Sequence, residues 1–115
     1  MIRFFVPGIP VPKQSFRYTK NGGGFTDPRM RAWQNAVVLY ATQNVDAMIT
    51  GEVHAHLSFF LPDNRRKDAD NLSKAVLDGL NGIAFKDDKV ITWLLIEKQI
   101  NKEHPGVLIE LREVV

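Results

Sequence analysis

The stretch RRKDADNLSKAVLDGLNGIAFKDD, residues 65–88, is the one strongly amphipathic segment of the chain. At about 100° per residue, its apolar positions fall on one side of a helix. Asp70, Lys74 and Asp78 follow one another at i, i+4 on roughly the opposite side. We therefore expect a helix over about 70–84, with one side packed on a core and a charged side left accessible. The apolar side comprises Leu72, Ala75, Val76, Gly79, Leu80 and Ile83.

Strand and helix patterns on both sides of this segment complete the expected fold. Alternating or continuous apolar runs predict strands, and Pro28 suits the first turn of another helix. Residues 10–26, rich in Pro and Gly, predict an extended arm with a flexible turn. We expect one α+β domain over 1–115, with two helices packed on a small mixed, largely antiparallel sheet. The further elements are strands over 2–6, 52–62, 89–101 and 106–114, the last two expected as an antiparallel pair, and a helix over 28–45.

Composition excludes several classes of protein. With 44% hydrophobic and 24% charged residues, the chain has an ordinary globular composition. No stretch approaches the roughly 18 consecutive apolar residues of a membrane span, and the first residues lack the basic region of a signal peptide. The absence of cysteine excludes disulfides and thiolate metal sites, and it suits a cytoplasmic location.

Charge is distributed unevenly, although the net charge is only +2. Basic residues gather in the first 31 positions and in the triplet at 65–67, whereas acids concentrate at 68–70, 87–88 and 110–113. This distribution predicts a basic surface around an acidic point, which indicates a polyanionic partner.

The acids around the amphipathic helix suggest a metal site. Asp68 and Asp70 would point the same way in an extended lead-in, and the pair at 87–88 follows the helix and could return beside them. Converging carboxylates repel one another unless a cation lies between them, and oxygen ligands without cysteine select Mg²⁺ or Mn²⁺. Such an ion, with Lys74 one helical turn from Asp70, could stabilise the charge that develops during phosphodiester hydrolysis.

A structural interpretation of the same acids remains open at this point. Aspartate is a common helix cap, and Asp70 with Lys74 could form a surface ion pair contributing about 0.3–0.5 kcal/mol. The acids at 87–88 could belong to a plain polar turn. Capping explains one acid, however, and not four beside a basic triplet and a lysine.

The chain resembles the RusA family of Holliday junction resolvases, found in bacteria and their phages. The matching pieces occur in the family's order between about 6 and 91, and the core RRKDADNLSKAVLDGLNG at 65–82 is specific. The other pieces are VPGIPVPKQSFR at 6–17, FTDPRMRAWQNAV at 25–37, FFLPDN at 59–64 and AFKDDKVI at 84–91.

The resemblance implies a homodimer that binds four-way DNA junctions and makes paired, symmetric nicks with Mg²⁺ or Mn²⁺. By motif position, the metal-binding catalytic acids fall on Asp68, Asp70 and Asp88, and the essential lysine falls on Lys74. Asp87 is the alternative to Asp88, because the spacing before this acid pair varies within the family.

Five basic residues are candidate DNA contacts. The match in the arm implies Lys13 and Arg17, and the triplet Arg65, Arg66 and Lys67 could hold phosphates that flank the cleaved bond. Two alternatives remain open: a divalent-metal nuclease for other branched or single-stranded DNA, and a protein that binds junctions without cutting. The biological process could be recombination, fork repair or the maturation of phage or prophage DNA.

Overall fold

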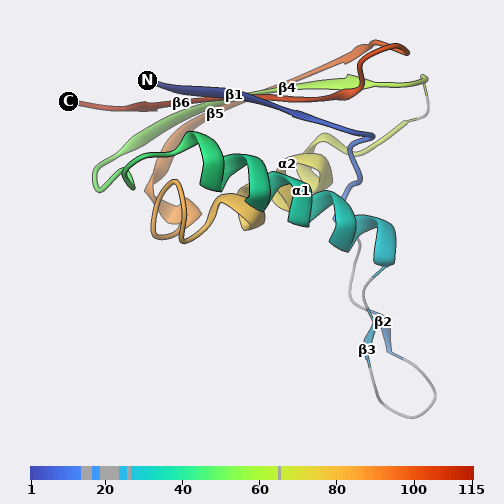
Figure 1. The fold of residues 1–115 in the computed structure, drawn as a ribbon, viewed down its shortest axis with the longest axis horizontal. Coiled ribbons are helices and arrows are strands. Elements are labelled where there is room, and N and C mark those ends of the chain that lie inside the picture. Colours follow the sequence, from blue (N-terminus) through green and yellow to red (C-terminus); the bar gives the residue numbers. More distant parts are fainter. Residues whose placement is uncertain (14–16, 19–23, 26, 65) are drawn as a thin grey trace.

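The computed structural model describes residues 1–13, 17–18, 24–25, 27–64 and 66–115. Its main body is a four-stranded sheet with both helices on one face (Figure 1). The expected α+β class, with two helices on a mixed sheet, is confirmed. No helix in the described ranges is long and apolar enough to cross a membrane.

The sheet has the strand order β1-β6-β4-β5. Strand β6 (Gly106–Glu113) pairs antiparallel with both β1 (Ile2–Pro7) and β4 (Val53–Leu61). Strand β5 (Ile91–Ile100) pairs parallel with β4 and forms one edge of the sheet. Two of the three pairings are therefore antiparallel.

The expected pairing of the last two strands with each other is wrong. Strand β4 lies between β5 and β6. The chain leaves β4, passes through helix α2 and returns as β5, and such a crossover places the second strand parallel to the first. In this register Ala55 lies opposite Leu94. The other side of β4 is then available to β6, although only a short turn joins β5 to β6.

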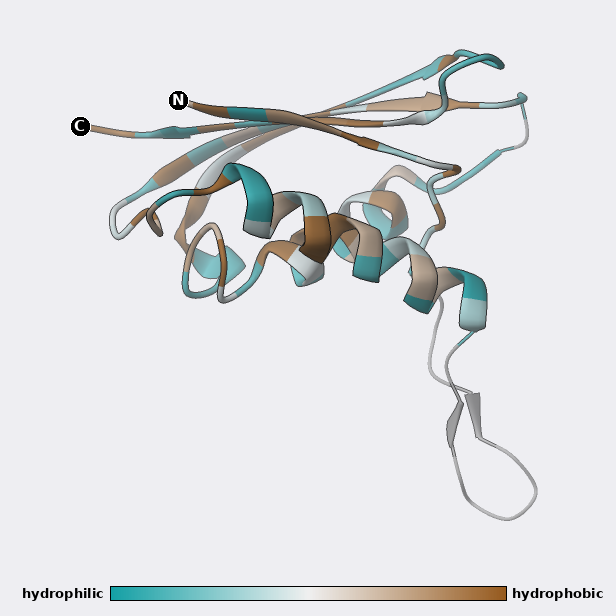
Figure 2. Cartoon of the chain, in the orientation of Figure 1, coloured by the Kyte–Doolittle hydropathy of each residue, from teal (hydrophilic) through white to brown (hydrophobic). Residues whose placement is uncertain are grey.

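The core lies between the sheet and the helices. Alternate residues of β4 face the helices and are buried, as the alternating hydropathy of the sheet strands in Figure 2 suggests. They meet the apolar sides of both helices in one cluster. Its members include Val53, Ala55, Leu57 and Phe59 of β4, Trp33, Val37 and Ala41 of α1, and Leu72, Ala75, Val76 and Leu80 of α2.

Both helices begin at an aspartate cap. Helix α1 (Pro28–Asn44) follows Asp27, whose side chain accepts a hydrogen bond from a backbone N–H of the first turn. Helix α2 (Ala69–Leu80) is shorter than the expected 70–84. It ends because the chain turns at Gly82, whose φ of +83° favours glycine and whose N–H donates to the Phe85 carbonyl at 2.7 Å.

The two helices approach each other closely at Gly79. A Cβ atom added to this residue would lie 3.0 Å from Val37 Cγ1, so the site can hold no side chain without movement. Helix α2, which carries Asp70 and Lys74 and is capped by Asp68, is therefore positioned by direct contact with α1 as well as with the sheet.

The expected arm is described in part. Strands β2 (Arg17–Tyr18) and β3 (Gly24–Phe25) form a two-stranded antiparallel sheet away from the main body (Figure 1). The expected turn at Gly22–Gly24 lies outside the described residues except for Gly24.

Candidate active site

The start of α2 presents two exposed carboxylates. Asp68 is the N-cap, and its Oδ1 accepts a hydrogen bond from the Asp70 backbone N–H at 2.9 Å. The capping interpretation is therefore confirmed for Asp68. Asp70 lies in the first turn, and its carboxylate forms no hydrogen bond or ion pair within the described part of the chain. Its oxygens are thus available to a ligand.

The two acids after α2, Asp87 and Asp88, have different contacts. Asp87 caps the short 3₁₀ helix η1 (Asp88–Val90) by accepting from the Lys89 backbone N–H at 2.9 Å. This hydrogen bond is the main reason that the pKa of Asp87 lies below its usual value. Asp88 instead reaches toward α2, with its Oδ2 3.6 Å from Lys74 Nζ. Of the two acids, Asp88 is the one that contacts Lys74.

Lys74 lies between two carboxylates. Its Nζ is 3.1 Å from Asp78 Oδ1 and 3.6 Å from Asp88 Oδ2. The hydrogen bond and charge of Asp78 raise the pKa of Lys74, and Asp88 adds a smaller contribution. The ion pair considered between Asp70 and Lys74 does not form. Lys74 pairs with Asp78 because that carboxylate is partly buried and a partly buried charge needs a counterion.

Asp78 is the residue whose role sequence reasoning missed. Its side chain is 17% exposed, and its Oδ2 contacts Lys13 Nζ while its Oδ1 contacts Lys74 Nζ. Burial alone would raise the pKa of Asp78, but the hydrogen bonds from Lys13 and Lys74 lower it below the usual value. The signal that could have found it is the i, i+4 spacing from Lys74.

Residues 10–13, the first part of the arm, lie against the start of α2. The Lys13 backbone N–H donates to the Asn71 carbonyl at 2.9 Å, and Lys67 Nζ donates to the Pro10 carbonyl at 2.7 Å. Two of the five predicted DNA contacts, Lys13 and Lys67, thus have partners inside the chain.

The other three predicted DNA contacts are placed less fully. Arg66 is exposed in the lead-in to α2. Arg17 lies in β2, but its side chain is not among the described ones, and Arg65 lies outside the described residues.

The predicted metal ligands have the right chemistry but are not assembled into a site. Within the ranges that the structure describes, no group of three or more acidic or histidine side chains could hold a metal ion. Asp68, Asp70 and Asp88 nevertheless offer oxygen atoms, the donor type that Mg²⁺ and Mn²⁺ prefer. An ion held by all three residues would require their carboxylates to converge more closely than they do in this structure.

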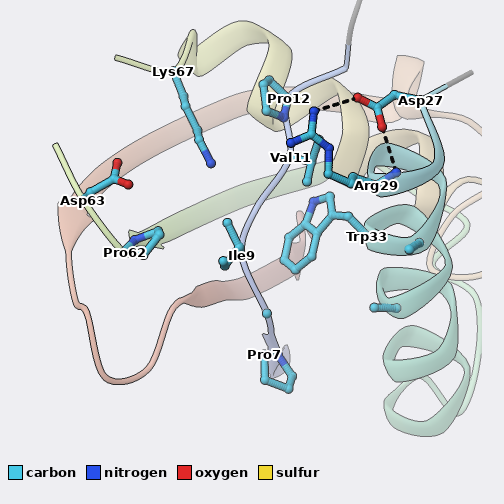
Figure 3. A pocket seen from close by; sticks show the side chains of 13 residues that line it. Pro7, Ile9, Val11, Pro12, Asp27, Arg29, Trp33, Pro62, Asp63 and Lys67 are labelled. Atoms are coloured by element: carbon cyan, nitrogen blue, oxygen red, sulfur yellow. Dashed lines mark hydrogen bonds and ion pairs between the residues drawn. The ribbon is translucent and has the colours of Figure 1, made fainter. Parts of the chain in front are cut away.

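A groove of about 810 Å³ lies beside the segment that leads into α2 (Figure 3). It runs between the arm, the first turns of α1 and the segment that joins β4 to α2. Ile9, Trp33, Pro62 and Lys67 are among its lining residues. Since Lys67 directly precedes Asp68, the groove opens next to the cap of α2.

Comparison with known proteins decides the family. Residues 7–112 match the model of the family described as endodeoxyribonuclease RusA. The chain belongs to the RusA family. The match includes the arm, both helices and the strands β4, β5 and nearly all of β6, so every candidate site residue of this RusA nuclease lies within the matched region.

Curated RusA proteins of bacteria are similar along most of their length. The crossover junction endodeoxyribonuclease RusA of Aquifex aeolicus is 30% identical over 115 residues, covering 96% of this chain and 90% of that protein. The proteins of the same name from Escherichia coli K12 and Shigella sonnei are 26% identical over 99 residues, covering 82% of each partner. The chain is accordingly a RusA-type endodeoxyribonuclease.

Proposed function

We propose that this RusA nuclease cuts four-way DNA junctions by hydrolysing phosphodiester bonds with Mg²⁺ or Mn²⁺. The observation that carries the proposal is the position of Lys74, whose ammonium group lies between Asp78 and Asp88 and one helical turn from the exposed Asp70. The names of the relatives, crossover junction endodeoxyribonucleases, support branched DNA as the substrate. As a nuclease acting on DNA, it would work in the cytoplasm, in recombination, fork repair or phage DNA processing.

The residues divide the chemistry between them. Asp68, Asp70 and Asp88 would hold the ion, which when bound supplies charge neutralisation at the phosphate. Lys74 would place its ammonium against a phosphate oxygen and stabilise the negative charge that grows there. Because Asp78 holds this flexible side chain, little entropy is lost when the phosphate arrives.

The surrounding basic residues would bind the backbone of the DNA. Arg66 is exposed beside the acids, and Lys13 and Lys67 lie where the arm meets α2. Cations in this position neutralise phosphates and release counterions, which favours binding of any DNA at low salt. Arg17 and Arg65 stay proposed DNA contacts by their positions in the sequence.

We further propose that two copies associate, since paired nicks on a two-fold junction require two sites in one symmetric body. Strand β5 supports this, because among the described residues it pairs only with β4 and its residues 93–96 are apolar on both faces. Trp93 is 49% exposed, and Leu94 and Leu95 are each 39% exposed. Strand residues that are apolar on both faces are typical of a sheet interior. An uncovered edge of this kind can pair with a strand of another chain.

The sequence of β5 suits antiparallel pairing with a second copy of itself. If the two-fold axis passes through Leu95, this residue faces Leu95 of the partner subunit. Leu94 then faces Ile96 of the partner subunit, and the charged residues Glu97 and Lys98 face uncharged positions. The two sheets would become one sheet of eight strands, with the helices of both copies on the same face.

A cleavage assay tests the nuclease proposal. A synthetic four-way junction, a Y-fork and a linear duplex are incubated with the protein in Mg²⁺ or in chelator, with Lys74→Met as the inactive control. We expect symmetric nicks in the junction that require metal and Lys74. Cutting of the Y-fork alone would favour the alternative nuclease, and binding without any cutting would favour the non-catalytic alternative.

A further inference from the structure

Asp78 differs from Asp68 and Asp70 in its surroundings. Asp68 and Asp70 are exposed, whereas the Asp78 side chain is 17% exposed and has an ammonium group on each oxygen. A carboxylate already paired on both oxygens is poorly suited to hold a metal ion as well. Its two partners point to a different task.

One partner of Asp78 comes from α2 and the other from a distant part of the chain. Lys74 lies one turn away on the same helix, while Lys13 is 65 positions away in the arm. Two ammonium groups repel each other, so they share this place only because a carboxylate lies between them. Without Asp78, both flexible side chains would be free to move apart.

The second contact of Lys74 is weaker and belongs to a residue with another role. Asp88 lies 3.6 Å from Lys74 Nζ, compared with 3.1 Å for Asp78. If Asp88 rotates toward Asp68 and Asp70, as the proposed ligand set requires, it leaves Lys74. Asp78 would then be the remaining anchor of the lysine.

The arm is fixed at the same place by its backbone. The Lys13 N–H donates to Asn71, and the Pro10 carbonyl accepts from Lys67. These bonds place the base of the Lys13 side chain, and Asp78 determines where its ammonium group lies. The Lys13 side chain is still 40% exposed, so a phosphate can reach it.

We infer that Asp78 is a positioning residue of the nuclease site, which holds Lys74 in place and fixes Lys13 beside it. The site then presents two ammonium groups, one from α2 and one from the arm, to the phosphate that is cut. This inference rests on the proposed nuclease activity. It assigns Lys13 to the cleaved phosphate rather than to remote DNA backbone, and it gives Asp78 a role without metal contact.

The test measures kcat and KM on a four-way junction, together with junction affinity in chelator and the melting temperature. Asp78→Asn keeps the shape of the side chain but binds the two ammonium groups less firmly. We expect kcat to fall about 10- to 100-fold, as for the loss of hydrogen bonds to a charged group. KM and metal-free affinity should stay within about twofold or improve, because a negative charge is lost. Glu103→Gln, an equal loss of charge in the turn between β5 and β6, should change none of these values.

A double-mutant cycle with Lys13→Met tests the coupling. Lys13→Met alone should also lower kcat, and it should reduce the slope of log affinity against log salt by about one. In the double variant, kcat should fall little further than in the worse single variant. If Asp78→Asn does not fold, Lys13→Met decides: a kcat within about twofold of the wild type removes Lys13 from the cleaved phosphate and overturns the inference.

Three other results would overturn it. The first is that Asp78→Asn retains a normal kcat. The second is that its kcat falls only in proportion to a lower melting temperature, together with weaker junction binding. The third is that the effects of the two single variants on kcat multiply in the double variant. If the unaltered protein cuts no branched DNA, the proposed function is refuted before kcat can test the inference. Junction binding in chelator then tests the inference, which is refuted if Lys13→Met leaves the slope of log affinity against log salt unchanged.

Discussion

Replacement of Asp70 by asparagine tests whether its carboxylate is a metal ligand or has a structural role. The Asp70 side chain is exposed and has no partner in the described structure, and the cap of α2 is Asp68. The change should therefore cost only the interaction of the charge with the helix dipole, about 0.3–1 kcal/mol. For a domain of this size, the melting temperature should fall by only a few degrees, since about 1 kcal/mol corresponds to roughly 4–8 °C in domains of 60–100 residues.

The effect of Asp70→Asn on cleavage should be much larger. A ligand that loses its charge binds the metal ion less tightly. A barrier raised by about 2.7 kcal/mol slows the reaction a hundredfold. In chelator the junction should bind slightly better. A unit charge about 6 Å from a phosphate costs about 0.7 kcal/mol in water, and its removal tightens binding about threefold.

Gel assays of junction nicking, fluorescence anisotropy in chelator and thermal unfolding measure these three quantities on one preparation. Glu103→Gln serves as the control for an equal loss of charge. Normal nicking by Asp70→Asn would refute the assignment of Asp70 to the metal. A large fall in melting temperature would refute the conclusion that its carboxylate has no structural role.

Further predictions concern assembly, DNA binding and acid stability. Because the chain has no cysteine, Leu95→Cys should oxidise to a disulfide-linked dimer if β5 pairs as proposed, and a species of one chain mass by light scattering would contradict this. Arg66→Ala should weaken junction binding and lower the salt slope by about one, whereas Lys67→Ala should also lower the melting temperature through loss of its bond to the arm. The Arg29 backbone N–H, aided by the Arg29 side chain, lowers the pKa of Asp27 below 3.8, so its stabilising effect is present above that pH and lost as pH falls through the lowered value. Asp27→Asn, which still caps α1, should weaken this acid dependence, and unfolding curves of the two proteins between pH 5 and 2 measure it; identical pH dependence would contradict the role.

The local features of the site were predictable from the sequence, because they depend on neighbours along the chain. The periodicity of α2 gave its buried side correctly, and its cap at Asp68 follows a common preference. The end of α2 was misplaced by four residues, since an apolar Ile83 continued the pattern beyond the turn at Gly82.

The features that were missed depend on distant segments. The contact of Asp78 with Lys13 joins positions 65 residues apart, and no local pattern indicates it. The neighbours of β5 and β6 likewise depend on where the crossover through α2 places β5. A short turn between two strands predicts a hairpin, and only the packing of the whole sheet shows that β4 takes the place between them.

The close contact of the two helices at Gly79 means that the residue types at positions 79 and 37 constrain each other. An alanine there would press on Val37 at 3.0–3.2 Å, and α2 would have to move by a few tenths of an ångström. Gly79 directly follows Asp78 and lies five residues after Lys74, so that displacement would reach the charged side of the helix. Helix α1 contributes no candidate ligand, yet its surface at position 37 limits which residues position 79 can accept. A larger residue at 79 should therefore occur in relatives only together with a smaller one at 37, and the two positions should vary as a pair.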